Sequence, residues 1–400
     1  MTSQVPDFRN HLPVRIDFGN GSIDRIGDAL LADGARAPFV LADPVVLALP
    51  EVRSMLAGLH ARGLSVTTSE VATGEPTLES VDALGVLLRE AHAAGRADAV
   101  LAIGGGSTLD SAKGARLLLA NPGSIGRYTW PGDPEPIAAP SVPLITVPTT
   151  SGTGSEVTGG VVMTDPATGL KVAAPSPLNR AQYCFVDPRL TLDLPPGPTL
   201  WGGVDALGQG IGSVIASVHT PVGDALGLEA VRLAARALPT VLTEPADLDA
   251  RTDMAAAALL AGLAMNVSES GTEHSLAHPL GSRHHLPHGL TVALVLAESM
   301  EHDRRYEPER MERIADAMGA SGEVQRTPDG VPDGSRAVRA VQQLLAELGC
   351  PTLRECGVTE DDVEPLTEAA LAGWIPVEPG PWTREDVATA YRQALALTAR

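Results

Sequence analysis

Apolar and polar positions follow two different patterns along the chain. Up to about residue 195, short apolar runs bounded by turn residues alternate with longer stretches of helical spacing. We predict strands at 38–42, 97–103, 142–147 and 161–163, and helices at 52–62 and 78–95. Such alternation favours an α/β fold with a mostly parallel sheet, in which ligands lie at the carboxyl ends of the strands.

The pattern changes at the proline-rich stretch Leu192–Pro198 (LDLPPGP), beyond which helix-forming residues dominate. We expect helices at 204–218, 224–238, 247–265, 290–300, 308–318, 335–348 and 384–397. The segment Glu323–Ser335 has the composition of a surface loop. The chain is therefore expected to form an α/β domain over 1–195 and an all-α domain over 196–400.

Composition narrows the class of protein. The formal charge of −20 argues against nucleic acid or an anionic membrane as a partner. No apolar run approaches the roughly 18 residues of a membrane span, and the first residues lack the pattern of a secretory signal. Cys184, Cys350 and Cys356 are an odd number without CxxC spacing, which fits a reducing compartment. We expect a soluble cytoplasmic protein.

Lysine is nearly absent from this chain. Of the 29 basic residues, only Lys113 and Lys171 are lysines. Against such an arginine-rich background, the two remaining ammonium groups suggest positions that need a compact point charge, although chance is the alternative.

A glycine-rich loop follows one of the predicted strands. The segment Ala102–Lys113 reads AIGGGSTLDSAK and leads into a helical stretch. Glycines at a strand end let a ligand approach the backbone, and the N-terminus of the next helix offers N–H groups to a phosphate. Lys113 lies one turn after Asp110, so both could face the ligand. A tight turn without a ligand is the alternative.

Two further features follow predicted strands. The segment Pro148–Thr158 (PTTSGTGSEVT) places six hydroxyl side chains and two glycines in eleven positions, a composition suited to ribose and phosphate oxygens. Asp43 follows the strand at 38–42, where an acidic residue accepts hydrogen bonds from a ribose in dinucleotide folds. An ordinary polar surface loop and a solvent-facing turn residue are the respective alternatives.

Histidines are concentrated in one short segment. Five of the ten histidines lie within fifteen residues, at positions 274, 278, 284, 285 and 288. His274 and His278 have i, i+4 spacing and share a helix face, while Pro287 and Gly289 place His288 in a turn. Imidazole is a common ligand of zinc and ferrous iron, and Asp205 could complete the set. We interpret His284 and His285 as surface or pocket-rim residues.

Taken together, these motifs resemble those of the iron-containing, or group III, alcohol dehydrogenases. The resemblance spans roughly residues 12 to 395. The segments that carry it are GGGSTLDSAK (104–113), PTTSGTGSEVT (148–158), FVDPRLTLDLPP (185–196), GVDAL (203–207) and HSLAHPLG with PHG (274–289). Five ordered motifs make the resemblance specific.

The resemblance implies a dinucleotide-binding domain over 1–195, a helical metal and substrate domain over 196–400, and a homodimer. It implies cofactor contacts for Asp43, Gly105, Gly106, Ser107, Asp110, Thr149, Thr150, Thr153 and Lys171. A carboxylate at position 43 would repel the 2′-phosphate of NADP, so NAD is expected and NADP is the alternative.

The metal site departs from the family pattern. The resemblance implies ligands at Asp205, His274, His288 and position 209, but Gln209 replaces the usual histidine and Gly212 replaces a following glutamate. An amide oxygen is a weak ligand, so the affinity for Fe²⁺ or Zn²⁺ should fall, although three protein ligands can suffice for catalytic zinc. His278, one turn after His274, is the candidate for proton transfer or for binding the substrate oxygen.

Two other departures concern the pocket. The segment Ser268–Glu273 (SESGTE) replaces a usually small and apolar stretch, and Glu75 stands where many members have an asparagine near the cofactor. If Glu269 or Glu273 faces the pocket, a polar or cationic substrate is favoured. If both side chains face solvent, they carry no information about the substrate.

The sequence therefore predicts a metal-dependent, NAD(P)-linked alcohol dehydrogenase or aldehyde reductase that acts on a small alcohol or aldehyde. One alternative is a lyase similar to dehydroquinate synthases, although the helical half contains no lysine for a phosphorylated substrate. A second alternative is a metal-free, non-catalytic relative that serves as a binding protein.

Overall fold

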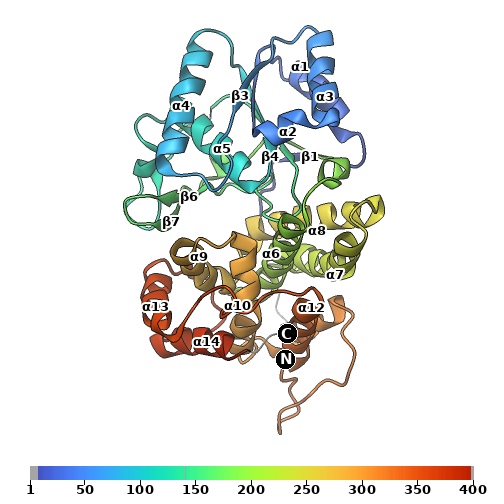
Figure 1. Cartoon of the computed structure of the whole chain (residues 1–400), viewed down its shortest axis with the longest axis vertical. Coiled ribbons are helices and arrows are strands. Elements are labelled where there is room, and N and C mark those ends of the chain that lie inside the picture. The colour runs from blue at the N-terminus through green and yellow to red at the C-terminus, as the bar shows by residue number, and fades with distance from the viewer. Residues whose placement is uncertain (1–7, 140, 398–400) are drawn as a thin grey trace. The chain divides into compact units, whose positions relative to one another are not determined.

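The computed structural model describes residues 8–139 and 141–397, which form two compact units (Figure 1). One unit is Leu12–Leu194, and the other contains the chain from Pro195 onward. The border therefore falls within the proline-rich stretch. The described residues before Leu12 group with the helical unit, however, and not with the α/β unit to which the range 1–195 assigned them.

The first unit is built around a six-stranded parallel sheet with the order β1-β8-β5-β4-β2-β3. Its strands are β1 (Arg15–Phe18), β2 (Pro38–Ala42), β3 (Thr67–Glu70), β4 (Ala99–Gly104), β5 (Leu144–Pro148) and β8 (Tyr183–Val186). Its helices are α1 (Ile26–Ala32), α2 (Pro44–Ala48), α3 (Pro50–Ala61), α4 (Leu78–Ala93) and α5 (Gly106–Ala120). The mostly parallel α/β fold predicted from the sequence is confirmed.

Helices cover both faces of this sheet because its central strands are apolar on both sides. On one face, Val40 and Leu101 pack with Leu59 of α3 and with residues of α1. On the other face, Leu41 packs with α4 and α5. Strand order reverses direction at the β2/β4 pair, since β3 lies outside β2 and β5 lies outside β4. Open α/β sheets bind ligands outside such a point.

The strand predicted at 161–163 exists but does not extend the parallel sheet. It forms β6 (Val162–Asp165), which pairs antiparallel with β7 (Leu170–Ala173) in a separate two-stranded sheet. The sequence predicted this strand but not its pairing, because a short apolar run does not specify its partner. The run is followed by the turn at 166–169, which returns the chain into a hairpin.

The second unit is helical throughout its regular elements. Its helices are α6 (Pro196–Ile215), α7 (Pro221–Thr243), α8 (Leu248–Ser268), α9 (Glu273–His284), α10 (His288–Asp303), α11 (Pro308–Ala317), α12 (Ser335–Glu347), α13 (Val363–Ala372) and α14 (Arg384–Ala396). The structure adds α13, which the sequence analysis did not predict. Every helix in the described chain is too short or too polar to cross a bilayer.

Helix α6 begins earlier than the sequence predicted, inside the proline-rich stretch. Pro196 and Pro198 occupy its first turn, where a missing N–H removes no helical hydrogen bond and the fixed φ of proline suits the helix. Nearly every residue from Gly203 to Ile215 is buried, so α6 forms the centre of the helical unit. Polar groups on this helix are therefore removed from water.

Two glycines hold α6 and α7 close together. A Cβ atom on Gly227 would lie 2.7 Å from the carbonyl oxygen of Gly210, and one on Gly210 would lie 3.0 Å from that of Gly227. Both obstacles are backbone atoms, so neither side can yield by a rotamer change. This contact fixes the depth at which α6 is buried.

We predict that Gly227→Ala lowers the free energy of unfolding of the protein by about 1–3 kcal/mol, because α7 must move away from α6. Gly58→Ala is the matched control: it also replaces a helical glycine, in α3, but its Cβ meets nothing within 4 Å. The control should be neutral or gain about 0.5–1 kcal/mol from helix propensity. Chemical denaturation measures both, and equal stabilities for the two variants would contradict the role of the Gly210–Gly227 contact.

Candidate active site

Three of the predicted cofactor segments meet at the carboxyl edge of the parallel sheet. The register pairs Ala42 with Ile103 and Gly104 with Pro148, so β2, β4 and β5 end side by side. Asp43, the glycine loop and the hydroxyl segment follow directly from these strand ends. Parallel pairing is thus the reason that segments about 60 and 45 residues apart converge.

The glycine loop packs against the hydroxyl segment. A Cβ on Gly106 would lie 2.6 Å from Cγ2 of Thr153, and one on Gly105 would lie 3.1 Å from Cγ2 of Thr150. The amide of Thr149 donates to the carbonyl oxygen of Gly104 at 3.0 Å. The absence of side chains at 105 and 106 therefore allows the two segments to touch. Gly105, Gly106 and Ser107 at the start of α5 remain partly exposed.

Asp110 is committed to interactions within the protein. Its carboxylate accepts hydrogen bonds from Lys113 Nζ at 3.0 Å, Ser155 Oγ at 2.5 Å and Val162 N at 3.0 Å. Lys113 is 1% exposed and also donates to the carbonyl oxygen of Gly160 at 2.8 Å. The pair shares a helix face, as predicted, but that face points into the unit and ties α5 to the hydroxyl segment. Asp110 and Lys113 therefore hold the glycine loop in place through contacts inside the unit.

The second lysine lies in the β6–β7 hairpin. Lys171 Nζ forms an ion pair with Glu75, the residue that departs from the family's asparagine. The Lys171 side chain is 10% exposed and that of Glu75 is 42% exposed. Asp43 caps α2, with Oδ1 accepting from the amide of Val46 at 2.9 Å. Lys171 and Asp43 therefore each have a local structural role as well.

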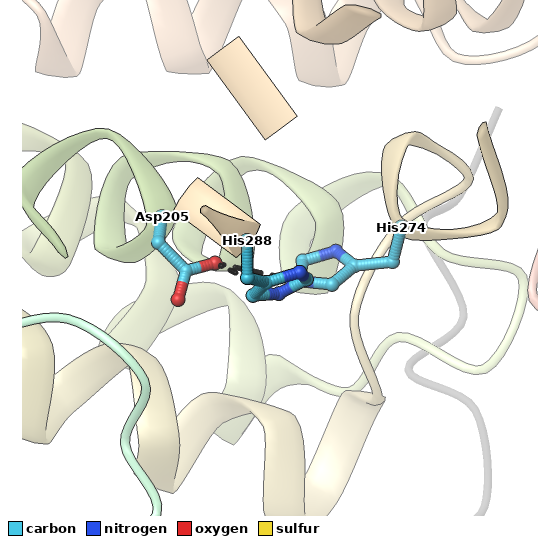
Figure 2. A group of neighbouring side chains, drawn as sticks. All are labelled: Asp205, His274 and His288. Atoms are coloured by element: carbon cyan, nitrogen blue, oxygen red, sulfur yellow. Dashed lines mark ion pairs between the residues drawn. The ribbon is translucent and has the colours of Figure 1, made fainter. Parts of the chain in front are cut away.

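The metal-ligand candidates come from three helices of the helical unit. Asp205 and Gln209 lie one turn apart on α6 and are 2% and 3% exposed. His274 is the second residue of α9, and His288 is the first residue of α10. Figure 2 shows both imidazole rings directed toward the Asp205 carboxylate. The ligand atoms of Asp205, His274 and His288 all lie within 4.8 Å of one another.

Gly289 explains how His288 reaches this position. A Cβ on Gly289 would lie 2.0 Å from the carbonyl oxygen of Trp201 on α6. Only glycine therefore allows the first turn of α10 to approach the α6 backbone near Asp205. Pro287, with φ of −56°, caps the helix and directs the chain into it.

The side chain of Asp205 fits a cation. Its Oδ1 is buried without a hydrogen-bond partner in the described structure, and it lies 3.5 Å from His274 Nε2 and 3.6 Å from His288 Nε2. These distances are long for hydrogen bonds. Ligand atoms about 2.1 Å from a tetrahedral ion lie about 3.4 Å apart, so the separations suit atoms that share a metal.

The electrostatics agree with this geometry. Burial alone would raise the pKa of Asp205, but the charge of His288, the neighbouring His274 and the amide of Gln209 lower it below its usual value. Burial alone would lower the pKa of His274, but the carboxylates of Asp205 and Glu273 raise it to about 10. The site therefore stabilises positive charge beside Asp205, carried either by protons or by a metal cation.

The other histidines lie around this group. The ring centroid of His278 is 6.1 Å from that of His274 and 5.5 Å from that of His288. His278 is half-buried, so it borders the group. His284 Nε2 lies 3.7 Å from Asp362 Oδ1, and His285 is exposed in a left-handed turn with φ of 54°.

The two glutamates of the SESGTE segment differ in their surroundings. Glu269 is exposed at the C-terminus of α8 and has φ of 57°, a conformation uncommon for a residue with a side chain. Glu273 is 1% exposed and accepts a hydrogen bond from His274 Nδ1 at 2.8 Å. Glu273 therefore faces neither solvent nor an open pocket, an arrangement that the sequence analysis did not anticipate. A glutamate directly before a predicted metal histidine was the available signal.

A parallel sheet with a glycine loop at its switch point and a buried Asp–His–His group define the class of dinucleotide- and metal-dependent dehydrogenases. The model of the iron-containing alcohol dehydrogenases matches residues 13–188, and that of the family's C-terminal region matches residues 199–395. The chain belongs to this family and is an NAD-dependent oxidoreductase that acts on alcohols. The family implies NAD(H) and a divalent metal.

Individual relatives extend the comparison. The chain is 31% identical over 360 residues to a choline dehydrogenase of Bacillus subtilis (strain 168), covering 90% of this chain and 88% of the relative. The crystal structure of a 1,3-propanediol oxidoreductase has a TM-score of 0.89 at 30% identity and covers 97% and 100% of the two chains. A sulfoacetaldehyde reductase from Bifidobacterium kashiwanohense in complex with NAD⁺ has a TM-score of 0.86 at 26% identity and covers 98% and 100%.

Glu156, in the hydroxyl segment, gives a pH-dependent prediction. Burial raises its pKa from the usual 4.5 to about 7, against the opposing charge of Lys113. Below pH 4.5 both the folded and the unfolded chain hold this proton. As the pH rises from 4.5 through 7, the unfolded chain loses this proton first and the folded chain loses it last. The free energy of unfolding therefore falls over this range, by about 3 kcal/mol in total.

Glu156→Gln carries no ionisable group and should lack this loss. Relative to the wild type, the variant should therefore become more stable as the pH is raised from 5 to 8. Urea denaturation at unit steps of pH measures the difference. A stability difference that stays constant across this range would show that Glu156 does not ionise within it.

Proposed function

We propose that Asp205, His274 and His288 hold the divalent metal of this dehydrogenase, and that the chain interconverts a small polar alcohol and its aldehyde with NAD. The observation that carries the metal assignment is the buried Oδ1 of Asp205. It lacks a hydrogen-bond partner in the described structure and faces two imidazole nitrogens at 3.5 and 3.6 Å.

When bound, the metal supplies a Lewis acid that polarises the substrate oxygen, and the nicotinamide exchanges a hydride with the carbinol carbon. Asp205 provides the charged ligand and holds both imidazole rings near it. His278, half-buried beside His274 and His288, is proposed to bind the substrate oxygen or to carry its proton. His278 is partly exposed, so it can exchange that proton with solvent.

Gln209 has a supporting role in this proposal. Its side chain donates a hydrogen bond that helps to keep the Asp205 carboxylate ionised. We propose three protein ligands, with Gln209 orienting Asp205 and contributing at most a weak amide oxygen. One carboxylate and two imidazoles suit Zn²⁺ with an open position, and also the Fe²⁺ sites built from two histidines and one carboxylate.

The cofactor is proposed to bind at the edge where β2, β4 and β5 end. The start of α5 offers amide groups from Gly105, Gly106 and Ser107 to the pyrophosphate. The proposed ribose and nicotinamide contacts are Asp43, Thr149, Thr150, Thr153 and Lys171. The Asp43 carboxylate disfavours the additional phosphate of NADP, so NAD is the proposed cofactor. Asp110 is proposed to act indirectly, through its bonds to Ser155 and Val162.

A polar substrate is supported by the names of two proteins to which the chain is similar. The choline dehydrogenase and the 1,3-propanediol oxidoreductase to which the chain is similar act, by their names, on polar alcohols. We also propose a homodimer in the cytoplasm. The family resemblance supports the dimer, and the free thiols of Cys184, Cys350 and Cys356 fit a reducing compartment.

The metal assignment predicts that Asp205→Ala and His274→Ala each lower NAD-linked turnover by about a hundredfold or more, because the charge that develops on the substrate oxygen loses its support. His285→Asn is the matched control. It changes an exposed histidine of the same segment, and asparagine tolerates the left-handed backbone at that position. Steady-state kinetics and metal content are measured on folded protein. Full turnover in both metal-site variants would remove the metal from the mechanism.

The substrate proposal is tested with choline, 1,3-propanediol, ethanol and 1-butanol, each with NAD and with NADP. We expect kcat/KM for a polar alcohol to exceed that for an apolar alcohol of similar size by about tenfold, and NAD to be preferred. A preference for 1-butanol would contradict the polar substrate. Binding of NADH without turnover of any alcohol or aldehyde would instead favour a non-catalytic binding protein.

A further inference from the structure

One buried carboxylate in the helical unit has no role in the proposed reaction. Glu273 is 1% exposed, and its Oε1 accepts hydrogen bonds from His274 Nδ1 at 2.8 Å and from the amide of Gly271 at 3.2 Å. Its Oε2 is also buried and has no hydrogen-bond partner in the described structure. Burial of an ionised carboxylate with one unsatisfied oxygen is unfavourable unless positive charge lies close by.

The contact defines which nitrogen of His274 carries a proton. Glu273 lies on the Nδ1 side of the ring, whereas Asp205 lies on the Nε2 side, 3.5 Å away. A carboxylate acceptor at Nδ1 keeps the proton there, which leaves the Nε2 lone pair directed toward Asp205 and His288. The ring is thereby held in the tautomer and orientation that a metal ligand requires.

The segment that carries Glu273 is closely packed. A Cβ on Gly212 of α6 would lie 2.2 Å from the amide nitrogen of Gly271, and one on Gly271 would lie 2.2 Å from Glu273 Oε2. The position at which the family usually has a glutamate is thus filled by the backbone of the segment itself.

Hydrogen bonds fix the same segment on both sides of Gly271. Thr272 Oγ1 donates to Asp303 Oδ2 at 2.5 Å, and Ser213 Oγ donates to the carbonyl oxygen of Glu269 at 2.7 Å. The carboxylate of Glu273 therefore has little freedom to leave the His274 ring.

We propose that Glu273 is a positioning residue that fixes His274 as an Nε2 ligand and strengthens the binding of a divalent cation by Asp205, His274 and His288. This inference rests on the metal site of the proposed function. A second carboxylate, placed behind a ligand, increases the donor strength of the imidazole and so offsets the weak amide oxygen of Gln209. Two carboxylates thus contribute the negative charge that stabilises the cation: Asp205 on the Nε2 side of the His274 ring and Glu273 on its Nδ1 side.

The test measures Co²⁺ and Zn²⁺ dissociation constants of the full chain by chelator competition. Glu273→Met keeps the length of the side chain but removes both acceptor and charge, and should weaken binding about 10- to 100-fold. Glu273→Gln keeps an acceptor for Nδ1 and should fall between Met and wild type. Glu347→Gln removes one carboxylate from α12, where it accepts from Gln343, and should bind as the wild type does.

A second readout separates positioning from general stability. The visible absorption bands of bound Co²⁺ report the ligand field, so they should shift in Glu273→Met and less in Glu273→Gln. Circular dichroism shows whether each variant is folded. If Glu273→Met does not fold, the affinity and the spectrum of Glu273→Gln alone test the proposal. Wild-type affinity and an unshifted spectrum in a folded Glu273 variant would overturn this inference alone. A wild-type chain that binds neither ion would overturn the proposed metal site together with it.

Discussion

The arrangement of the helical unit depends on the ionised carboxylate of Asp205 in a nearly water-free position. Helix α6 is buried on almost all sides, so this carboxylate cannot be solvated and must be neutralised by nearby positive charge. His274 and His288 lie beside it, each brought there by a specific backbone feature. Gly289 lets α10 approach α6, and Gly212 lets the segment before α9 do the same. The glycines of the second half are thus as important to the site as its charged residues.

Much of this arrangement could be predicted from the sequence, because it depends on local patterns. The i, i+4 spacing of the histidines and the Pro-His-Gly turn can be recognised in the sequence without coordinates. The convergence of strand ends follows from parallel pairing, and it brings Asp43, the glycine loop and the hydroxyl segment to one edge. The roles of these residues as ligands and cofactor contacts remain predictions.

The features that could not be predicted depend on orientation or on long-range packing. Glu273 and His274 are neighbours on a helix, where adjacent side chains do not normally face each other. They meet because the carboxylate curls back toward the amide of Gly271, at the start of α9. For Asp110 and Lys113 the spacing predicted a shared face but not the side of α5 on which it lies. That side is set by the contacts of Asp110 with Ser155 and Val162, which are distant in sequence.

Both lysines of the chain form ion pairs within the protein. Their rarity suggested positions that need a compact point charge, and in the structure each lysine pairs with a carboxylate, Lys113 with Asp110 and Lys171 with Glu75. For Lys113 the compact ammonium matters because it fits a fully buried position with two oxygen acceptors, where a guanidinium would leave donors unsatisfied. At Lys171, the carboxylate of Glu75 pairs with the ammonium group that is proposed to contact the cofactor. Like Glu273 behind His274, Glu75 changes the electrostatics of a site while leaving the fold of the family intact. Differences in chemistry between this chain and its relatives are therefore expected to follow from where these additional carboxylates lie.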